Sequence, residues 1–118
     1  MVIRELPRNE WGPFLEGFTL QHDHWLVNVE RLRDAERDIA VQNAPLEGVV
    51  ARPDEIVITV GGSLDSHERF SLPDPRRIRV ESEGGVDTAL QIEQGDGAVT
   101  RMAFRSPIAP ELVDGIAP

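Results

Sequence analysis

Hydrophobic positions in the N-terminal part of the chain follow the period of a helix. The apolar residues of segment 9–21 fall at positions i, i+3, i+4 and i+7, which is the spacing of one helix face. These residues are Trp11, Phe14, Leu15 and Phe18. Asn9 is the expected N-cap, because its side-chain oxygen can accept a hydrogen bond from the first helical turn. The spacing predicts a helix over about residues 9–21 that packs on the core through this apolar stripe.

From His24 onward the hydrophobic period falls to two, which is the period of a β-strand. Short apolar and β-branched runs alternate with turns rich in Gly, Pro and charged residues. These runs are residues 24–30, 39–43, 46–51, 55–60 and 67–72. Because Pro45 separates the second run from the third, we expect two strands there. The β-branched run at 55–60 is typical of a strand buried on both faces.

The last third of the chain predicts three neighbouring strands with a defined register. A three-residue loop centred on Asp96 places apolar residues opposite apolar residues, whereas a two-residue turn would not. An odd-numbered loop near Gly85 does the same for the preceding pair of strands. The resulting partners are Leu90 with Met102, Ile92 with Thr100, Ile78 with Ile92, and Val80 with Leu90. One face of this meander is therefore expected to be apolar, and the other to be charged.

Together these patterns predict a mainly β (α+β) fold. We expect a single curled antiparallel sheet or a small barrel of about 7–8 strands, with the N-terminal helix packed on it. Residues 1–105 are expected to form one domain, since 118 residues of which 40% are hydrophobic suit a single core. Residues 106–118 form a Pro-rich C-terminal tail in this scheme.

The composition limits the chemistry that is open to this chain. It has no Cys, no Tyr and no Lys, which removes thiolate nucleophiles, cysteine metal sites and Schiff-base chemistry. A net charge of −9 repels phosphate backbones, so we expect no nucleic-acid partner. Arg4 and Glu5 interrupt the start of the chain, and no apolar run approaches the length of a membrane span. We therefore expect a cytoplasmic protein with neither a signal peptide nor a membrane partner.

The stretch QHDHWLV contains the first candidate site. His22 and His24 would point to the same side if both lay on one strand, as in His-x-His metal sites, and His67 could complete the ligand set. The structural alternative is that His22 ends the helix, where the dipole favours a partly positive side chain, and that residues 23–24 turn the chain into the first strand. A bound metal is the one cofactor that this pattern suggests, and the alternative requires none.

The charged face of the C-terminal meander is the second candidate. The predicted register places Arg79, Gln91 and Arg101 in one row across three strands and sets Arg77 opposite Glu93. Two arginines on one face could hold a carboxylate or a phosphate, or contact a protein partner. The alternative is a solvated face on which neighbouring acidic residues balance the arginines.

Several short motifs resemble a bacterial family of small domains of unknown function. They are LPRNEW and FLEGF near the N-terminus, QH with WLV and VE after it, PLEGV, the pattern I.I..GG, His67 ahead of LPDP, and ALQIE followed by DG. The resemblance covers roughly residues 5–105. Family members commonly have a glycine between the first histidine and the tryptophan, so His22 matches the family pattern and His24 does not. The resemblance implies no known activity.

Two functions follow from these observations. The first is a non-catalytic module that binds a protein partner or a second copy of itself, as a homodimer, through exposed strand edges or the arginine face. The alternative is a protein that binds a small ligand or depends on a metal, and that uses His22, His24 and His67 at the rim of a curled sheet. We identify no catalytic residue from the sequence.

Overall fold

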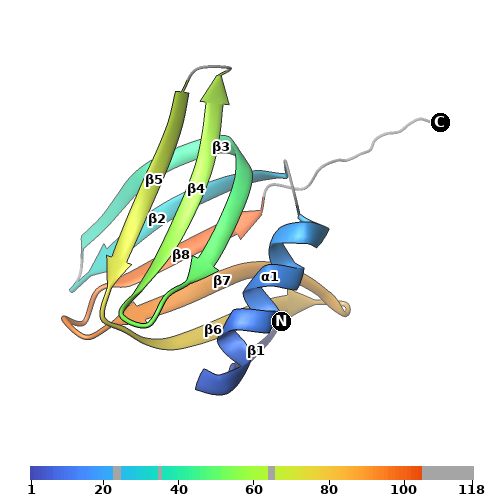
Figure 1. Cartoon of the computed structure of the whole chain (residues 1–118), viewed down its shortest axis with the longest axis vertical. Coiled ribbons are helices and arrows are strands. Elements are labelled where there is room, and N and C mark those ends of the chain that lie inside the picture. The colour runs from blue at the N-terminus through green and yellow to red at the C-terminus, as the bar shows by residue number, and fades with distance from the viewer. Residues whose placement is uncertain (23–24, 35, 64–65, 105–118) are drawn as a thin grey trace.

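The computed structural model describes residues 1–22, 25–34, 36–63 and 66–104. Within these residues, the fold consists of one antiparallel sheet of eight strands and a single α-helix near the N-terminus (Figure 1). The strands are β1 (Val2–Glu5), β2 (Leu26–Arg33), β3 (Glu36–Ala51), β4 (Glu55–Ser63), β5 (Ser66–Pro73), β6 (Pro75–Glu83), β7 (Val86–Gln94) and β8 (Val99–Phe104). The helix α1 (Trp11–Gln21) follows a short 3-10 helix, η1 (Arg8–Glu10). The predicted mainly β fold with an N-terminal helix is confirmed, whereas the predicted boundary after residue 105 lies outside the described residues.

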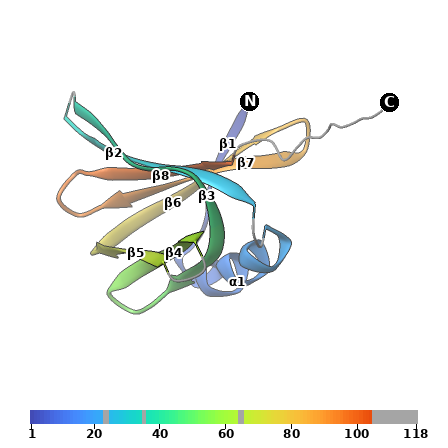
Figure 2. The same cartoon turned by 90° about the horizontal axis from the view of Figure 1, so that it is seen from above.

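The sheet is made of two meanders in the order β1-β6-β7-β8-β2-β3-β4-β5. Strands β2 to β5 and strands β6 to β8 are each consecutive in the chain, and the pairing of β8 with β2 joins the two meanders. Figure 2 shows that β3 bends out of the plane of β2 and β8 and carries β4 and β5 below them, beside α1. In the described part of the chain β1 and β5 are the two ends of the order, so the sheet is curled and open rather than a closed barrel.

The hydrophobic core lies between the two layers of the curled sheet and α1. Every strand except β1 contributes buried apolar side chains, and α1 contributes Trp11, Leu15 and Phe18. Phe14 is only partly buried and packs against the same cluster. Ile56, Val57 and Ile58 are all buried, as predicted for a strand covered on both faces. The helical stripe and the strand alternation therefore identify the core correctly.

The start of the helix differs from the prediction. Asn9 is not an N-cap, because the chain forms η1 first and Glu10 occupies the N-cap position of α1 without a side-chain capping bond. The backbone N–H of Glu10 donates to the carbonyl of Pro7, and the indole Nε1 of Trp11 donates to the carbonyl of Leu6 at 3.1 Å. The helix entry is held by this buried tryptophan instead of by a capping side chain.

The two strands predicted on either side of Pro45 are one continuous strand, β3, of 16 residues. It pairs with β2 as far as Pro45 and with β4 from Leu46 onward. Asn43 has a positive φ of 54°, and its backbone N–H donates a hydrogen bond to the side-chain Oδ1 of Asn28. The register with β2 shifts at this point. This bulge bends β3 without ending it, because a single left-handed residue turns a strand while the flanking residues stay extended. The prediction of separate strands was therefore wrong.

The predicted register of the C-terminal meander is confirmed at all four predicted pairs. After β7 the N–H of Gln94 donates to the carbonyl of Ala98, and this bond closes a loop of three residues, 95–97. Gly97 in this loop has a φ of 91°, and its N–H donates to the carbonyl of Gln94. The loop after β6 is different from the prediction. It is a two-residue turn in which Gly84 and Gly85 have φ of 59° and 83°, and a register shift after Glu81 restores the predicted pairing.

The first strand, β1, was not predicted from the sequence. Its four residues are all exposed and show no alternation, and they pair with β6 between Val2–Ser82 and Glu5–Arg79. β1 thus forms one edge of the sheet and carries the exposed apolar residues Val2 and Ile3. The opposite edge of the sheet, β5, carries the charged residues Glu68 and Arg69, which discourage pairing with other chains.

Replacing Gly17 with Ala is expected to raise the free energy of unfolding by about 0.5–1 kcal/mol. Gly17 lies within α1, and the space where a Cβ would lie contains no atom within 4 Å. Chemical denaturation of the two proteins would measure the gain. Gly12→Ala is the control, since its Cβ space is also open but its position before Pro13 disfavours a helical conformation for any residue with a Cβ. An equal gain in both variants would contradict this interpretation.

Candidate functional site

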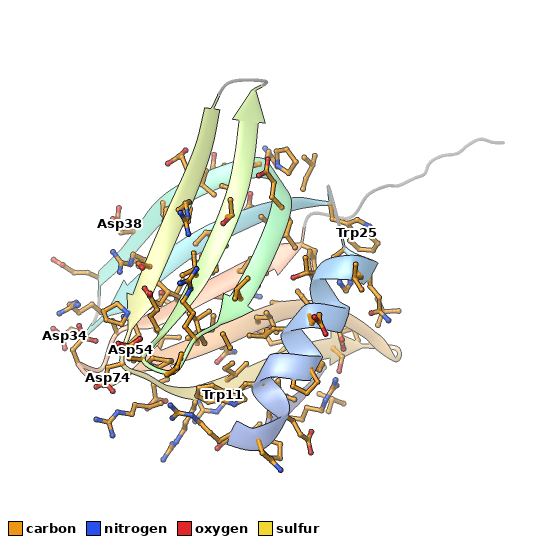
Figure 3. All side chains as sticks on the ribbon, in the orientation of Figure 1. Trp11, Trp25, Asp34, Asp38, Asp54 and Asp74 are labelled. Atoms are coloured by element: carbon orange, nitrogen blue, oxygen red, sulfur yellow. The ribbon has the colours of Figure 1, made fainter. Side chains whose placement is uncertain are left out.

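His22 lies at the C-terminal end of α1 and is buried, with 6% of its surface exposed. It belongs to an aromatic cluster made of Phe14, Phe18, His22, Trp25 and Phe104. The imidazole stacks on the ring of Phe104 with centroids 4.4 Å apart, and the ring of Trp25 meets its edge at 4.7 Å. Figure 3 shows Trp25 beside this end of α1 and Trp11 near the other end. The prediction that His22 ends the helix is confirmed.

The imidazole is also held by a hydrogen bond. Its Nδ1 lies 2.9 Å from the carbonyl oxygen of Phe18, which can only accept, so Nδ1 carries the proton and donates. In the neutral ring only Nε2 would then be open to a metal. Ring stacking and this bond account for the position of His22 as a core residue.

The other two histidines of the predicted metal site are not brought to His22 by the part of the chain that the structure describes. His24 lies outside the described residues. The backbone of His67 lies on β5 opposite Gly61, and strands β3 and β4 separate β5 from β2, the strand that follows His22. Among the described residues, no group of three or more His, Asp or Glu side chains could hold a metal ion. A metal site built on these histidines stays a prediction.

The arginine face has the predicted row, but two of its arginines, Arg79 and Arg101, are paired with carboxylates of the protein. Arg79, Gln91 and Arg101 lie opposite one another across β6, β7 and β8, and Arg77 lies opposite Glu93. Arg79 is 3.2 Å from Glu93. Both nitrogens Nε and Nη2 of Arg101 donate to the carboxylate of Glu81, at 2.8 and 2.9 Å. An added anion would have to compete with these carboxylates, and whether one binds stays a prediction.

Glu81 is the centre of this network, and its burial was not predicted from the sequence, which indicated only that neighbouring acidic residues could balance the arginines on a solvated face. Its side chain is only 4% exposed, and Gln91 donates a further hydrogen bond to it at 2.7 Å. The hydrogen bond from Arg101 lowers the pKa of Glu81, against the opposite effect of burial, and Gln91 lowers it further. The pKa of Arg101 is raised mainly by the same hydrogen bond. Glu30, 3.8 Å from Arg101, extends the network to β2.

A groove of about 510 Å³ lies between α1 and the C-terminal part of β3. It is lined by Gly12, Glu16, Thr19, Leu20, Val49, Val50 and Ala51. Two of its apolar side chains face solvent, Leu20 with 78% and Val50 with 52% of their surfaces exposed. Apolar side chains gathered in a concave surface are typical of binding sites.

The groove exists because β3 leaves β2 at Pro45. Beyond that residue one edge of β3 has no neighbouring strand among the described residues, and α1 lies beside it. At one residue of this edge, the hydroxyl of Thr19 makes the hydrogen bonds that a neighbouring strand would otherwise make. It accepts from the N–H of Val49 at 3.0 Å and donates to the carbonyl of Val49 at 3.3 Å.

The free edge of β3 continues past Thr19 into the groove. Alternate residues of an antiparallel strand direct their N–H and C=O groups to the same side. Since those of Val49 face α1, those of Ala51 have the same direction. The groove therefore combines apolar walls with a backbone donor and acceptor, which are the elements used when an extended peptide adds to a sheet edge.

No helix in the described ranges is long and apolar enough to cross a lipid bilayer.

Comparison with known families matches residues 2–112 to a family described as "Family of unknown function (DUF5335)". No curated protein and no solved structure matches the chain.

Proposed function

Because the chain belongs to the family of unknown function DUF5335, we propose a function from its own surface: a non-catalytic module that binds a protein segment in the groove between α1 and β3. The observation that carries this proposal is that exposed Leu20 and Val50 lie together at an edge of β3 that has no neighbouring strand among the described residues. We assign the expected binding or self-association module to this groove.

The chemistry of the groove indicates what the partner segment would look like. Leu20, Val50 and Val49 offer apolar contacts, so an anchoring apolar side chain would lose water on binding. Glu16 adds a carboxylate to the lining, and the whole chain has a net charge of −9. A short apolar segment with a basic residue beside it therefore complements this surface best.

Two other features support a binding role over catalysis. The chain lacks Cys, Lys and Tyr, which leaves few residue types that could act as nucleophile or base. Two of the three arginines of the predicted anion site, Arg79 and Arg101, are engaged by carboxylates of the same sheet. We expect the module to work in the cytoplasm, with a protein partner rather than a nucleic acid.

Val50→Asp is expected to weaken binding of groove-directed peptides at least about tenfold, since it places a charge in an apolar contact worth about 1.4 kcal/mol or more. Peptides would be selected from a random displayed library against the unmodified protein, and their Kd measured by calorimetry for each variant. Val86→Asp is the matched control, because Val86 is similarly exposed at 57%, also lies on a strand, and does not line the groove.

The proposal would be abandoned if the selected peptides bound the Val50→Asp variant as tightly as the unmodified protein. It would also fail if Val86→Asp weakened binding equally, since the effect would then come from added negative charge rather than from the groove. Both substitutions replace exposed side chains, so the fold should tolerate them.

A further inference from the structure

We propose that two copies of this chain associate through β1, which pairs antiparallel with β1 of the other copy about a two-fold axis that passes through Ile3. The inference goes beyond the proposed function, because β1 does not line the groove between α1 and β3. It assigns the self-association expected from exposed strand edges to one edge of the sheet and to one register. The sheets of the two copies would continue into one another across the axis.

The outer edge of β1 is open to a further strand. β1 is the end of the sheet order, and in the described part of the chain only β6 pairs with it. Its apolar residues Val2 and Ile3 have 63% and 48% of their surfaces exposed. Figure 2 shows the N-terminal end of β1 on the opposite side of the sheet from α1, so the helix does not cover this end.

The hydrogen bonds between β1 and β6 show which backbone groups face a second copy. The N–H of Leu6 donates to the carbonyl of Ile78 at 2.8 Å, which continues the register of β1 and β6 by one pair. Alternate residues of an antiparallel strand direct their N–H and C=O groups to the same side. The even-numbered residues of β1 therefore face β6, as Leu6 does, whereas the N–H and C=O groups of Ile3 and Glu5 face outward.

Charge and length select the register of the two strands. Residues with outward-facing groups must pair with one another, so the two-fold axis passes through one residue of β1 and not between two. An axis through Arg4 or Glu5 places that charged residue opposite its own copy, and like charges directly opposite are destabilising. An axis through Val2 avoids this repulsion but engages only residues 1–3 of each chain.

An axis through Ile3 engages residues 1–5 and brings no like charges directly opposite. The two Ile3 residues exchange backbone N–H···O=C bonds and place their β-branched side chains side by side, and Val2 lies opposite Arg4 of the other copy. One short strand buries less than the about 800 Å² per partner that a stable interface needs, and each copy carries a net charge of −9. The association is therefore weak and reversible, and a test has to trap it.

The absence of cysteine from the chain permits this trapping in the full-length protein. Ile3→Cys and Val2→Cys would each be oxidised with diamide at about 0.15 M salt, where charge repulsion is screened beyond about 8 Å. Non-reducing electrophoresis would measure the disulfide-linked dimer. We expect Ile3→Cys to cross-link at least about tenfold faster, because its two Cα atoms lie about 5.5 Å apart across the axis, whereas those of position 2 are diagonal neighbours beyond about 7 Å.

A second pair of variants tests whether strand pairing brings the thiols together. Glu5→Pro, added to Ile3→Cys, removes an outward-facing N–H and leaves the bonds to β6 in place. We expect it to lower the cross-linking rate to that of Val2→Cys. Glu5→Gln, added to Ile3→Cys, is the matched control, since it removes the same charge but keeps the N–H, and it should leave the fast rate unchanged.

Equal rates for Ile3→Cys and Val2→Cys would overturn the inference, because random collision would then explain both. Exposure alone predicts the opposite order from the one expected, since Val2 is more exposed than Ile3. Faster cross-linking of Val2→Cys would also overturn it, because the axis would then not pass through Ile3. A fast rate that survives Glu5→Pro would show that the two copies meet without pairing their strands. Circular dichroism of the reduced variants would check that each keeps the fold.

Discussion

Replacing Arg101 with Met is expected to lower the free energy of unfolding at pH 7 by about 3 kcal/mol, because the variant leaves the carboxylate of Glu81 buried without its cation. The side chain of Glu81 is 4% exposed and receives two hydrogen bonds from Arg101. Gln91 would remain as a donor, but one neutral amide does not replace a bidentate guanidinium. Urea denaturation followed by circular dichroism would measure the loss.

The loss should depend on pH with a definite sign. The folded-state pKa of Glu81 is lowered from its ordinary value of 4.5, so its pairing with Arg101 stabilises the fold above that value. This contribution disappears as the pH falls through the lowered, folded-state pKa, because a protonated carboxyl no longer needs a cation. The difference between the unmodified protein and Arg101→Met should therefore shrink in acid.

Two further variants sharpen this prediction. Arg77→Met removes an exposed arginine from the same face and should change stability by no more than about 0.5 kcal/mol. The double variant Arg101→Met/Glu81→Leu removes both charges, and we expect it to recover most of the lost stability, since apolar pairs often replace buried ion pairs without cost. An equal loss in Arg77→Met and Arg101→Met would show that Glu81 is not the reason for the effect.

Phe18→Ala is expected to destabilise the fold by about 3–5 kcal/mol, the usual cost of removing a buried phenyl ring. Phe18 is 3% exposed and is the central ring of the aromatic cluster, with centroid distances of 5.7 Å to Phe14, 4.4 Å to His22 and 5.2 Å to Phe104. Its removal is expected to leave a cavity where α1 meets the end of β8. Guanidinium denaturation would give the loss, and near-ultraviolet circular dichroism would report the aromatic environment of Trp25.

The matched control for this prediction is Phe14→Ala, in the same helix and one turn earlier. Phe14 is only partly buried, so its removal should cost about 1–2 kcal/mol, less than that of Phe18. A similar loss from both variants would mean that helix packing in general, and not the aromatic cluster, fixes α1 on the sheet.

Much of the fold follows from local patterns in the sequence. The register of β6, β7 and β8 was predictable because alternation fixes which face is apolar, and the loop at Asp96 then leaves one pairing that keeps Leu90 opposite Met102. The apolar stripe of α1 was also predictable, because helical periodicity identifies which residues share one face. Three of its four residues are buried in the structure. The paired glycines Gly84 and Gly85 show the limit of this reasoning, because a bulge can restore a register that the loop length alone would shift.

The candidate site depended on contacts that local patterns do not contain. Pro45 suggested a break between two strands, but the bend is made at Asn43 and the strand continues to a new partner. The groove results from that change of partner, so no motif in the sequence marks it. Glu81 likewise becomes central only when the sheet brings Arg101 and Gln91 to it. His22 was placed correctly at a helix end, yet its burial depends on Phe104 from the last strand.

The pairing of β8 with β2 also has a consequence for the order of folding. Hairpins within each meander join strands that are neighbours in the chain, so their loops close at little entropic cost, whereas Val29 and Met102 must meet from opposite ends of the sequence. The entropic cost of closing a loop grows slowly, by about 0.6 kcal/mol for each doubling of its length, but it is incurred before any contact across the seam can repay it. We therefore expect the two meanders to form early and the β2–β8 seam to close late. Closure of that seam is the step that joins the two meanders into a single sheet.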